Sequence, residues 1–262
     1  MLNPALSIAE DPSGAAQVVA DLLEDLIRVR PDASLALPTG RTPLRLYDEL
    51  AERYRAGRID FRAARAFNLD EWVGVTGNAP GSYARFMNEH LFSRVNLAPT
   101  RRAIPDGLAP DLTAECARYE RRIHEAGGID LAILGIGRNG HIGFNEPDTP
   151  FDSRTHVVEV TAETRVANRW SFPDGEVPTK AITVGIATIL GARQVVLLAT
   201  GAAKADVLRR LLDGPIDPAF PASALRLHPR VQVVADALAA RTNRPEPQAP
   251  ENFAAPPYGP LP

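Results

Sequence analysis

The segment Leu37–Leu44 (LPTGRTPL) combines glycine, hydroxyl groups and a cation just before a helical pattern. An apolar run precedes it, and a proline stands at a position that suits the first turn of a helix. Backbone N–H groups and hydroxyls at a helix N-terminus are typical of an anion site, although an ordinary glycine turn fits equally well. The candidate anion-binding residues are Thr39, Gly40, Arg41 and Thr42.

A second segment of this kind places Lys204 in the sequence Ala199–Ala205 (ATGAAKA). It also follows an apolar run and leads through a glycine turn into a helical pattern. A lysine in the first turn opposes the helix dipole, so a bound anion would account for it better than solvent would. We therefore expect Lys204 to join the anion site.

Two adjacent carboxylates, Asp70 and Glu71, follow the apolar run in Phe67–Gly74 (FNLDEWVG). A carboxylate at the end of a buried strand can face a cleft and act as a base. Adjacent side chains of an extended chain point to opposite sides, so we expect one functional and one structural carboxylate. Taken alone, two acidic residues in a loop are more often simply solvated.

The segment Leu134–Pro147 (LGIGRNGHIGFNEP) is dense in glycine. The spacing Gly135, Gly137 and Gly140 is that of a dinucleotide-binding loop, which requires a helix directly after it. Pro147 and Pro150 exclude a regular helix of useful length there. We therefore expect no dinucleotide, and the glycines instead allow the backbone to approach a ligand closely.

The same loop presents His141 beside Asn139 and Glu146. A histidine with a carboxylate nearby predicts an acid–base relay in which the carboxylate orients the imidazole and supports its charge. The sequence has no H-x-x-x-H spacing and no evident third ligand, so we expect no metal. The relay is favoured over a structural histidine at this position.

Short apolar runs alternate with amphipathic stretches along most of the chain. The alternation predicts a single α/β domain with a mainly parallel sheet and helices on both faces, an open Rossmann-like architecture. Strands are expected at 34–37, 64–68, 129–134, 194–199 and 231–234. Helices are expected near 19–27 and at 43–55, 82–91, 112–125, 161–170, 180–190 and 202–212.

Composition limits the remaining possibilities. The 262 residues are 45% hydrophobic and carry a net charge of −3. This charge gives no bulk attraction to nucleic acid or to a membrane surface. No basic and apolar leader and no membrane-length apolar run are evident, so we expect a cytoplasmic protein.

The single Cys116 excludes an internal disulfide and is expected to be inert. We expect one domain over 1–240 and an extended, Pro-rich tail over 241–262.

Four motifs in this order resemble the glucosamine-6-phosphate deaminase family. They are LPTG at 37–40, FNLDEWVG at 67–74, GRNGHIGFNEP at 137–147 and FPASALRLHP at 220–229. The resemblance extends from about residue 34 to residue 236. The related 6-phosphogluconolactonases have an Asp-Glu-Arg element and an Asp-Gly-His loop, from which the second and third motifs differ.

The resemblance implies conversion of glucosamine 6-phosphate to fructose 6-phosphate and ammonia, in amino-sugar catabolism. His141 would pass a proton to the ring oxygen, and Asp70 would move a proton from C2 to C1. Glu146 and Asn139 would complete the relay with His141. No cofactor is implied, because the amine and carbonyl of the substrate provide the electronic pathway.

The resemblance also implies which residues bind the phosphate. Thr39–Thr42 and Lys204 would surround it, together with an arginine near position 169. The only partner implied is the small sugar phosphate, bound by a monomer or a small homo-oligomer.

Three positions depart from the family pattern. Many members have aspartate where this chain has Asn139, which can orient a histidine but cannot stabilise its charge. Arg169 comes one residue early, about 100° around a helix, so it either reaches the phosphate by a local shift or loses that contact. His156 and Val158 replace basic residues of the activator site in allosteric members, so we expect no activation by an acetylated sugar phosphate.

Other functions remain open from the sequence. A lactonase-like hydrolase would use the same pocket without releasing ammonia. A deaminase for an epimeric amino sugar phosphate would differ only in contacts to one hydroxyl. A non-catalytic sensor would keep the anion site, but the presence of Asp70, His141 and Glu146 together disfavours it.

Overall fold

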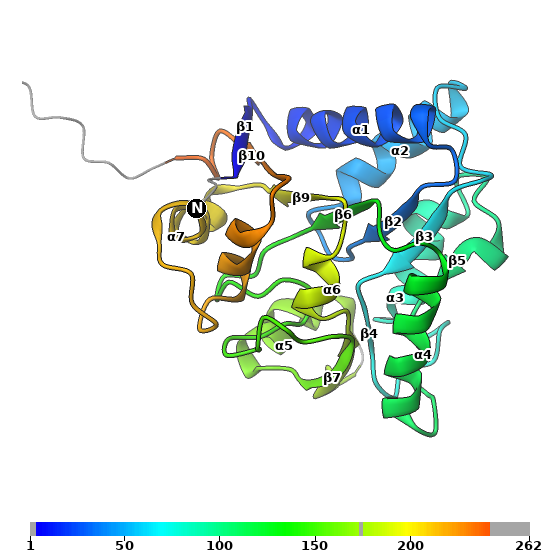
Figure 1. Ribbon diagram of the computed structural model, residues 1–262, viewed down its shortest axis with the longest axis vertical. Coiled ribbons are helices and arrows are strands. Elements are labelled where there is room, and N and C mark those ends of the chain that lie inside the picture. The colour runs from blue at the N-terminus through cyan, green and yellow to red at the C-terminus, as the bar shows by residue number, and fades with distance from the viewer. Residues whose placement is uncertain (1–3, 173–174, 242–262) are drawn as a thin grey trace, which may run out of the picture.

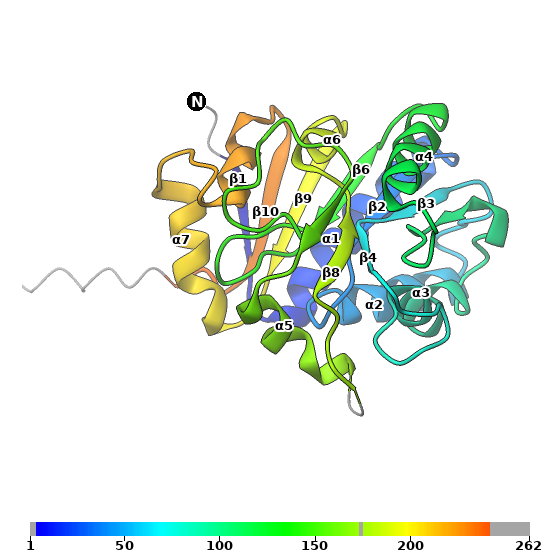
Figure 2. The same cartoon turned by 90° about the horizontal axis from the view of Figure 1, so that it is seen from below.

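The computed structural model describes residues 4–172 and 175–241. Its main sheet has seven parallel strands in the order β1-β10-β9-β6-β2-β3-β5. Figure 2 shows these strands side by side, from β1 to β3. The bounds are β1 Ala5–Ala9, β2 Ser34–Leu37, β3 Arg65–Asn68, β5 Arg102–Ala103, β6 Leu131–Leu134, β9 Gln194–Ala199 and β10 Val231–Asp236.

Helices cover both faces of this sheet (Figure 1). One face packs against α1 (Pro12–Val29), α2 (Leu44–Arg55), α3 (Tyr83–Met87) and the π-helix η1 (Asn88–Phe92). The other packs against α4 (Leu112–Glu125), α6 (Ile186–Leu190), α7 (Ala205–Asp213) and the 3₁₀ segment η5 (Pro221–Leu227). The central strands β2 and β6 are buried along their whole length, as expected of a parallel sheet covered on both faces.

A second sheet of three antiparallel strands lies beside the first, in the order β4-β8-β7. Its strands are β4 Asp70–Trp72, β7 His156–Glu159 and β8 Lys180–Thr183, and α5 (Ala162–Asn168) with the 3₁₀ turn η3 (Arg169–Ser171) lies between β7 and β8. Trp72 is fully buried there and packs against Phe144 with ring centroids 4.7 Å apart. The small sheet thereby fixes the start of β4, where Asp70 stands.

The expected fold class is confirmed, and so are the five expected strands, with shifts of at most two residues at their ends. The helix expected over 180–190 is wrong in its first half. Lys180–Thr183 instead forms β8, because its backbone is paired on both sides, by β4 and by β7. The helix begins only at Ile186, after Gly185, whose absent Cβ would collide with the backbone carbonyls of residues 153 and 154. The Pro-rich tail expected from 241 lies almost wholly outside the described residues.

Strand order places a crevice between β2 and β6. From β2 the chain proceeds outward through β3 and β5, and it then returns to the other side of β2 at β6. Loops at the carboxyl ends of two such strands diverge to opposite faces and leave room for a ligand. Both loops are motifs singled out in the sequence. Among the described residues, no helix is long and apolar enough to cross a membrane.

Glu71 joins the small sheet to the start of α3. Its Oε1 accepts hydrogen bonds from the backbone N–H of Trp72 at 2.8 Å and of Tyr83 at 3.0 Å. Its Oε2 accepts from Ser82 Oγ at 3.0 Å and from the N–H of Ala84 at 2.9 Å. The carboxylate thus satisfies free N–H groups at the start of α3, which otherwise have no partner within the helix.

We predict that Glu71→Gln lowers the free energy of unfolding by about 2–4 kcal/mol, because an amide NH₂ would face N–H donors and leave buried groups unpaired. Urea denaturation followed by circular dichroism measures this. The matched control is Glu89→Gln, which removes only a surface pair with Arg85 and costs less than about 0.5 kcal/mol. Equal stabilities of the two variants would contradict the structural role of Glu71.

Candidate active site

A cavity of about 770 Å³ opens at the carboxyl ends of the central strands. It is lined by the turn after β2, the start of β4, the glycine-rich loop after β6, the helix α5 and the start of α7. Its volume is in the range of small-molecule sites. The structure brings together nine of the ten residues singled out from the sequence: eight line the cavity, and Glu146 stands directly behind His141.

Asp70 lies on the floor of this cavity, with only 6% of its surface exposed. Its Oδ1 has no hydrogen-bond partner among the described residues. Its Oδ2 would lie 3.5 Å from a Cβ at position 143, where the backbone has a φ of +58° that favours glycine. Burial, and to a smaller extent the neighbouring Glu71, raise the pKa of the Asp70 carboxyl to about 8.

His141 stands on the wall above the loop backbone. Its ring packs so closely on Gly137 that a Cβ there would lie 2.3 Å from ring atoms, which explains the glycine. The Nδ1 atom lies 3.3 Å from Thr164 Oγ1 and 3.7 Å from Glu146 Oε2. Burial lowers the pKa of His141, the Glu146 carboxylate opposes this change, and the Lys204 charge adds to it. The lowered pKa favours the neutral imidazole, which can both accept and donate a proton.

Asn139 holds the loop and Glu146 in place. Its Nδ2 donates to Glu146 Oε2 at 2.8 Å, and its Oδ1 accepts from the backbone N–H of His141 at 3.1 Å. Thr161 donates to the other oxygen of Glu146 through both its N–H and its hydroxyl. Asn139 therefore contacts the backbone of His141 and not its ring, and the negative charge beside the imidazole comes from Glu146.

The turn after β2 and the start of α7 supply the cationic side of the cavity. Thr39, Gly40, Arg41 and Thr42 line it directly before α2. Lys204, in the 3₁₀ turn before α7, donates from Nζ to the carbonyl of Ile136 at 2.6 Å. Burial lowers the pKa of Lys204, and so does the nearby Arg138.

Arg169 is the one predicted residue that the structure does not bring to the cavity. It begins the 3₁₀ turn after α5, is exposed, and is not among the residues that line the cavity. Trp170 lines the cavity instead, and the Arg41 guanidinium lies 5.1 Å from the centre of the Trp170 ring. The one-residue offset thus rotates the arginine out of the site, as the period of a helical turn requires.

Sequence reasoning missed several cavity residues. The chief of these is Arg138, which lies within the glycine-rich loop. Four more are Tyr83, Thr164, Asn168 and Trp170. The position of Arg138 directly before Asn139 could have indicated it, because a cation in a backbone turn beside a ligand is typical of anion sites. The other four come from elements whose position depends on tertiary packing.

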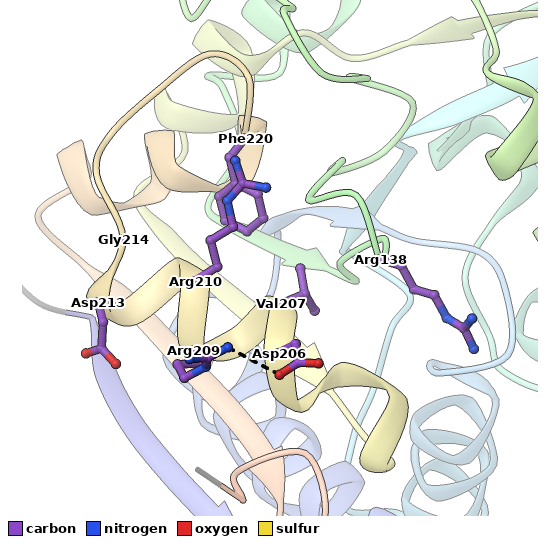
Figure 3. A pocket seen from close by; sticks show the side chains of 8 residues that line it. All are labelled: Arg138, Asp206, Val207, Arg209, Arg210, Asp213, Gly214 and Phe220. Atoms are coloured by element: carbon purple, nitrogen blue, oxygen red, sulfur yellow. Dashed lines mark hydrogen bonds and ion pairs between the residues drawn. The ribbon is translucent and has the colours of Figure 1, made fainter. Parts of the chain in front are cut away.

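A second cavity, of about 490 Å³, lies between α7 and the glycine-rich loop (Figure 3). Two of its arginines are engaged with a carboxylate or with an aromatic ring. Arg209 pairs with Asp206 at 3.4 Å, and the Arg210 guanidinium lies 4.3 Å from the centre of the Phe220 ring. The larger cavity, which holds the buried carboxyl and the histidine, is therefore the candidate active site. Within the described part of the chain, no group of three or more metal-binding side chains is found.

Comparison with known proteins places this site in a family. The family model described as glucosamine-6-phosphate isomerases/6-phosphogluconolactonase matches residues 10–234. A glucosamine-6-phosphate deaminase of Bacillus velezensis is 48% identical over 222 residues, covering 84% of this chain and 92% of the relative. Glucosamine-6-phosphate deaminase 1 of Bacillus subtilis is 46% identical over 225 residues, covering 86% and 93%.

Solved structures agree with the sequence comparison. The structure of a monomeric glucosamine-6-phosphate deaminase has a TM-score of 0.88 at 44% identity and covers 90% of this chain and 98% of the other. A 6-phosphogluconolactonase from Trypanosoma cruzi has a TM-score of 0.73 at 22% identity, with 90% and 96% covered, and shares the fold. Fold and site together define an α/β enzyme with a cationic pocket beside a buried carboxyl and a histidine. The chain belongs to the family of glucosamine-6-phosphate isomerases and 6-phosphogluconolactonases.

The raised pKa of Asp70 gives a prediction for stability against pH. A carboxyl whose pKa is about 8 when folded and 3.8 when unfolded costs stability increasingly as pH rises between those values. Asp70→Asn should therefore melt higher than the wild type at pH 8.5, by about 2–4 °C for each 1 kcal/mol gained in the free energy of unfolding. It should lose this advantage towards pH 4.

Differential scanning calorimetry at pH 5, 7 and 8.5 measures the effect. Asp206→Asn is the matched control, because its side chain is 89% exposed and its removal takes no charge out of the interior. A melting difference for Asp70→Asn that does not grow with pH would contradict the raised pKa.

Proposed function

We propose that this chain converts glucosamine 6-phosphate and water to fructose 6-phosphate and ammonia. The observation that supports this best is the buried Asp70 carboxyl, which lines one cavity together with His141, the glycine-rich loop and a cationic side. The relatives at 44–48% identity are named glucosamine-6-phosphate deaminases. We further propose that it acts in the cytoplasm, in amino-sugar catabolism.

The phosphate of the substrate binds at the cationic side of the cavity. The turn Thr39–Thr42 supplies N–H groups and hydroxyls directly before α2, where the helix dipole favours an anion. Lys204 supplies a charge. Its pKa is lowered by burial and by a neighbouring cation, and the negative charge of a phosphate dianion would offset both effects. Binding at this end directs C1 and C2 of the sugar towards Asp70.

His141 opens the pyranose ring by passing a proton to the ring oxygen. Its neutral imidazole carries one N–H and one free nitrogen, so it can accept a proton from the C1 hydroxyl and return one to the ring oxygen. Glu146 lies close enough to Nδ1 to stabilise the imidazolium that forms in passing. Asn139 keeps Glu146 in this position through its 2.8 Å hydrogen bond.

Asp70 moves the proton that converts the aldose to a ketose. The ionised carboxyl takes the C2 proton, which gives an enolamine, and it returns that proton to C1. The resulting C2 imine is hydrolysed by water, so the C2–N bond breaks and ammonia leaves. A pKa near 8 makes Asp70 a much stronger base than an exposed aspartate, which suits removal of a proton from carbon.

The third motif supports the deaminase over a lactonase. Phe144 packs against Trp72, and Asn145 Nδ2 donates to the carbonyls of Ile142 at 2.8 Å and Val184 at 2.9 Å. These contacts bring Glu146 to His141. A sequence of the lactonase type at 144–147 would lack the amide and the carboxylate. The lactonase is the alternative, and the assay below distinguishes the two reactions.

We propose a monomer or a small homo-oligomer without allosteric activation. The similar solved deaminase is monomeric by its description. His156 and Val158 stand on β7, where the family resemblance requires basic residues for an activator. The resemblance itself implies no metal and no organic cofactor.

The direct test is ammonia and fructose 6-phosphate formation from glucosamine 6-phosphate, with purified protein and added chelator. We expect equal amounts of both products, and we expect Asp70→Asn to lower kcat at least about 10³-fold because it removes the proton carrier. Binding of fructose 6-phosphate to this variant should stay within about threefold.

Two results would count against the proposal. Turnover of a 6-phosphogluconolactone by the same protein, without ammonia release from glucosamine 6-phosphate, would favour the lactonase. Loss of fructose 6-phosphate binding in Asp70→Asn, together with loss of turnover, would show that Asp70 has a binding role instead.

A further inference from the structure

Arg138 is a cation at the cavity that has no ion-pair partner among residues 4–172 and 175–241. It lies at the tip of the glycine-rich loop, directly before Asn139, and it lines the candidate active site together with the Thr39–Thr42 turn. Lys204, on the opposite loop, is likewise without a carboxylate in the described residues and bonds only to a backbone carbonyl. Unpaired cations that converge on one cavity indicate an anionic ligand.

The direction of the Arg138 side chain supports this interpretation. Figure 3 shows its guanidinium pointing away from Arg209 and Arg210, although all three residues border the second cavity. Those two arginines are engaged with Asp206 and Phe220. The positive charge of Arg138 is also close enough to Lys204 to lower the pKa of that lysine. Two neighbouring cations repel each other, and an anion bound between them would offset this repulsion.

Arg169, in contrast, is outside the cavity. Its exposed side chain belongs to the 3₁₀ turn Arg169–Ser171, and the neighbouring Trp170 occupies the cavity wall and stacks with Arg41. The resemblance gives the phosphate site an arginine near position 169 in addition to Arg41. Another arginine at the cavity can replace it, because guanidinium groups bind phosphate through two parallel hydrogen bonds that lysine cannot provide.

We propose that Arg138 supplies the guanidinium that binds the substrate phosphate in this chain, in the role that the family resemblance gives to an arginine near position 169. This inference rests on the proposed function for the identity of the substrate. It adds a binding residue from the glycine-rich loop, three positions before the catalytic candidate of that loop, His141. The loop that holds the acid–base relay would then also bind the phosphate.

The test compares three substitutions of one kind: Arg138→Met, Arg169→Met and Arg209→Met. Calorimetry measures the Kd of inorganic phosphate and of fructose 6-phosphate, and ammonia release gives kcat/KM for glucosamine 6-phosphate. We expect Arg138→Met to raise both Kd values and to lower kcat/KM by about 10- to 100-fold, as loss of a charge-assisted hydrogen-bonding group does. The two control variants should stay within about twofold of the wild type.

Arg138→Lys separates charge from geometry. It keeps the positive charge but loses the paired hydrogen bonds. We therefore expect its Kd values to lie between those of the wild type and those of Arg138→Met. All four variants change exposed side chains, so their melting temperatures should match that of the wild type.

Unchanged phosphate affinity in Arg138→Met, or the larger loss in Arg169→Met, would overturn the inference. A wild-type chain that binds neither ligand would overturn it as well. Failure of the proposed function is a separate outcome. A wild-type chain that binds inorganic phosphate but releases no ammonia contradicts the deaminase reaction, while the Kd values of the variants still decide whether Arg138 binds the anion.

Discussion

The site depends on the burial of one carboxyl group, that of Asp70, whose Oδ1 has no hydrogen-bond partner among the described residues. Asp70 can remain there because its neighbour Glu71 is fully occupied by four donors at the start of α3 and so fixes β4. Two adjacent acidic residues thereby acquire opposite roles. One carboxylate is satisfied and holds the fold, and the other is desolvated and has its pKa raised to about 8. A strong base in a buried position is the property that proton removal from carbon requires.

The rest of the architecture brings three loops to that carboxyl. The sheet order opens a crevice between β2 and β6, and the loops after these strands supply the anion-binding turn and His141. The loop after β9 adds Lys204 from the adjacent strand. The small antiparallel sheet holds β4 against β8, so that Asp70 faces the loop after β6. Each contributing segment is short, and its position follows from strand pairing.

Much of this could be predicted from the sequence, for identifiable reasons. Buried parallel strands such as β2 and β9 appear as short apolar runs with abrupt polar ends, and the side chains after those ends meet at one edge of the sheet. The alternation of side chains along an extended chain also separated the roles expected of Asp70 and Glu71. The residues from these loops, including Asn139 and Glu146, accordingly lie together in the structure.

The remaining features depend on tertiary contacts. Lys180–Thr183 resembles the beginning of a helix because its strand character comes from pairing with β4 and β7, which are distant in sequence. The orientation of Arg169 depends on where α5 gives way to a 3₁₀ turn, and a shift of one residue decides whether an arginine or Trp170 faces the cavity. The only signal for Arg138 is its position directly before Asn139, and that signal is weak because a charged residue in a glycine-rich loop is equally compatible with solvent.

The central claim is that Asp70, buried on the floor of the cavity, carries the proton between C2 and C1. The most direct measurement uses glucosamine 6-phosphate deuterated at C2, with turnover in ordinary water and analysis of the fructose 6-phosphate by NMR. A buried carboxyl exchanges its proton with solvent slowly, so the account predicts that a substantial share of the product carries deuterium at C1. Product whose C1 hydrogen comes entirely from the solvent would contradict it.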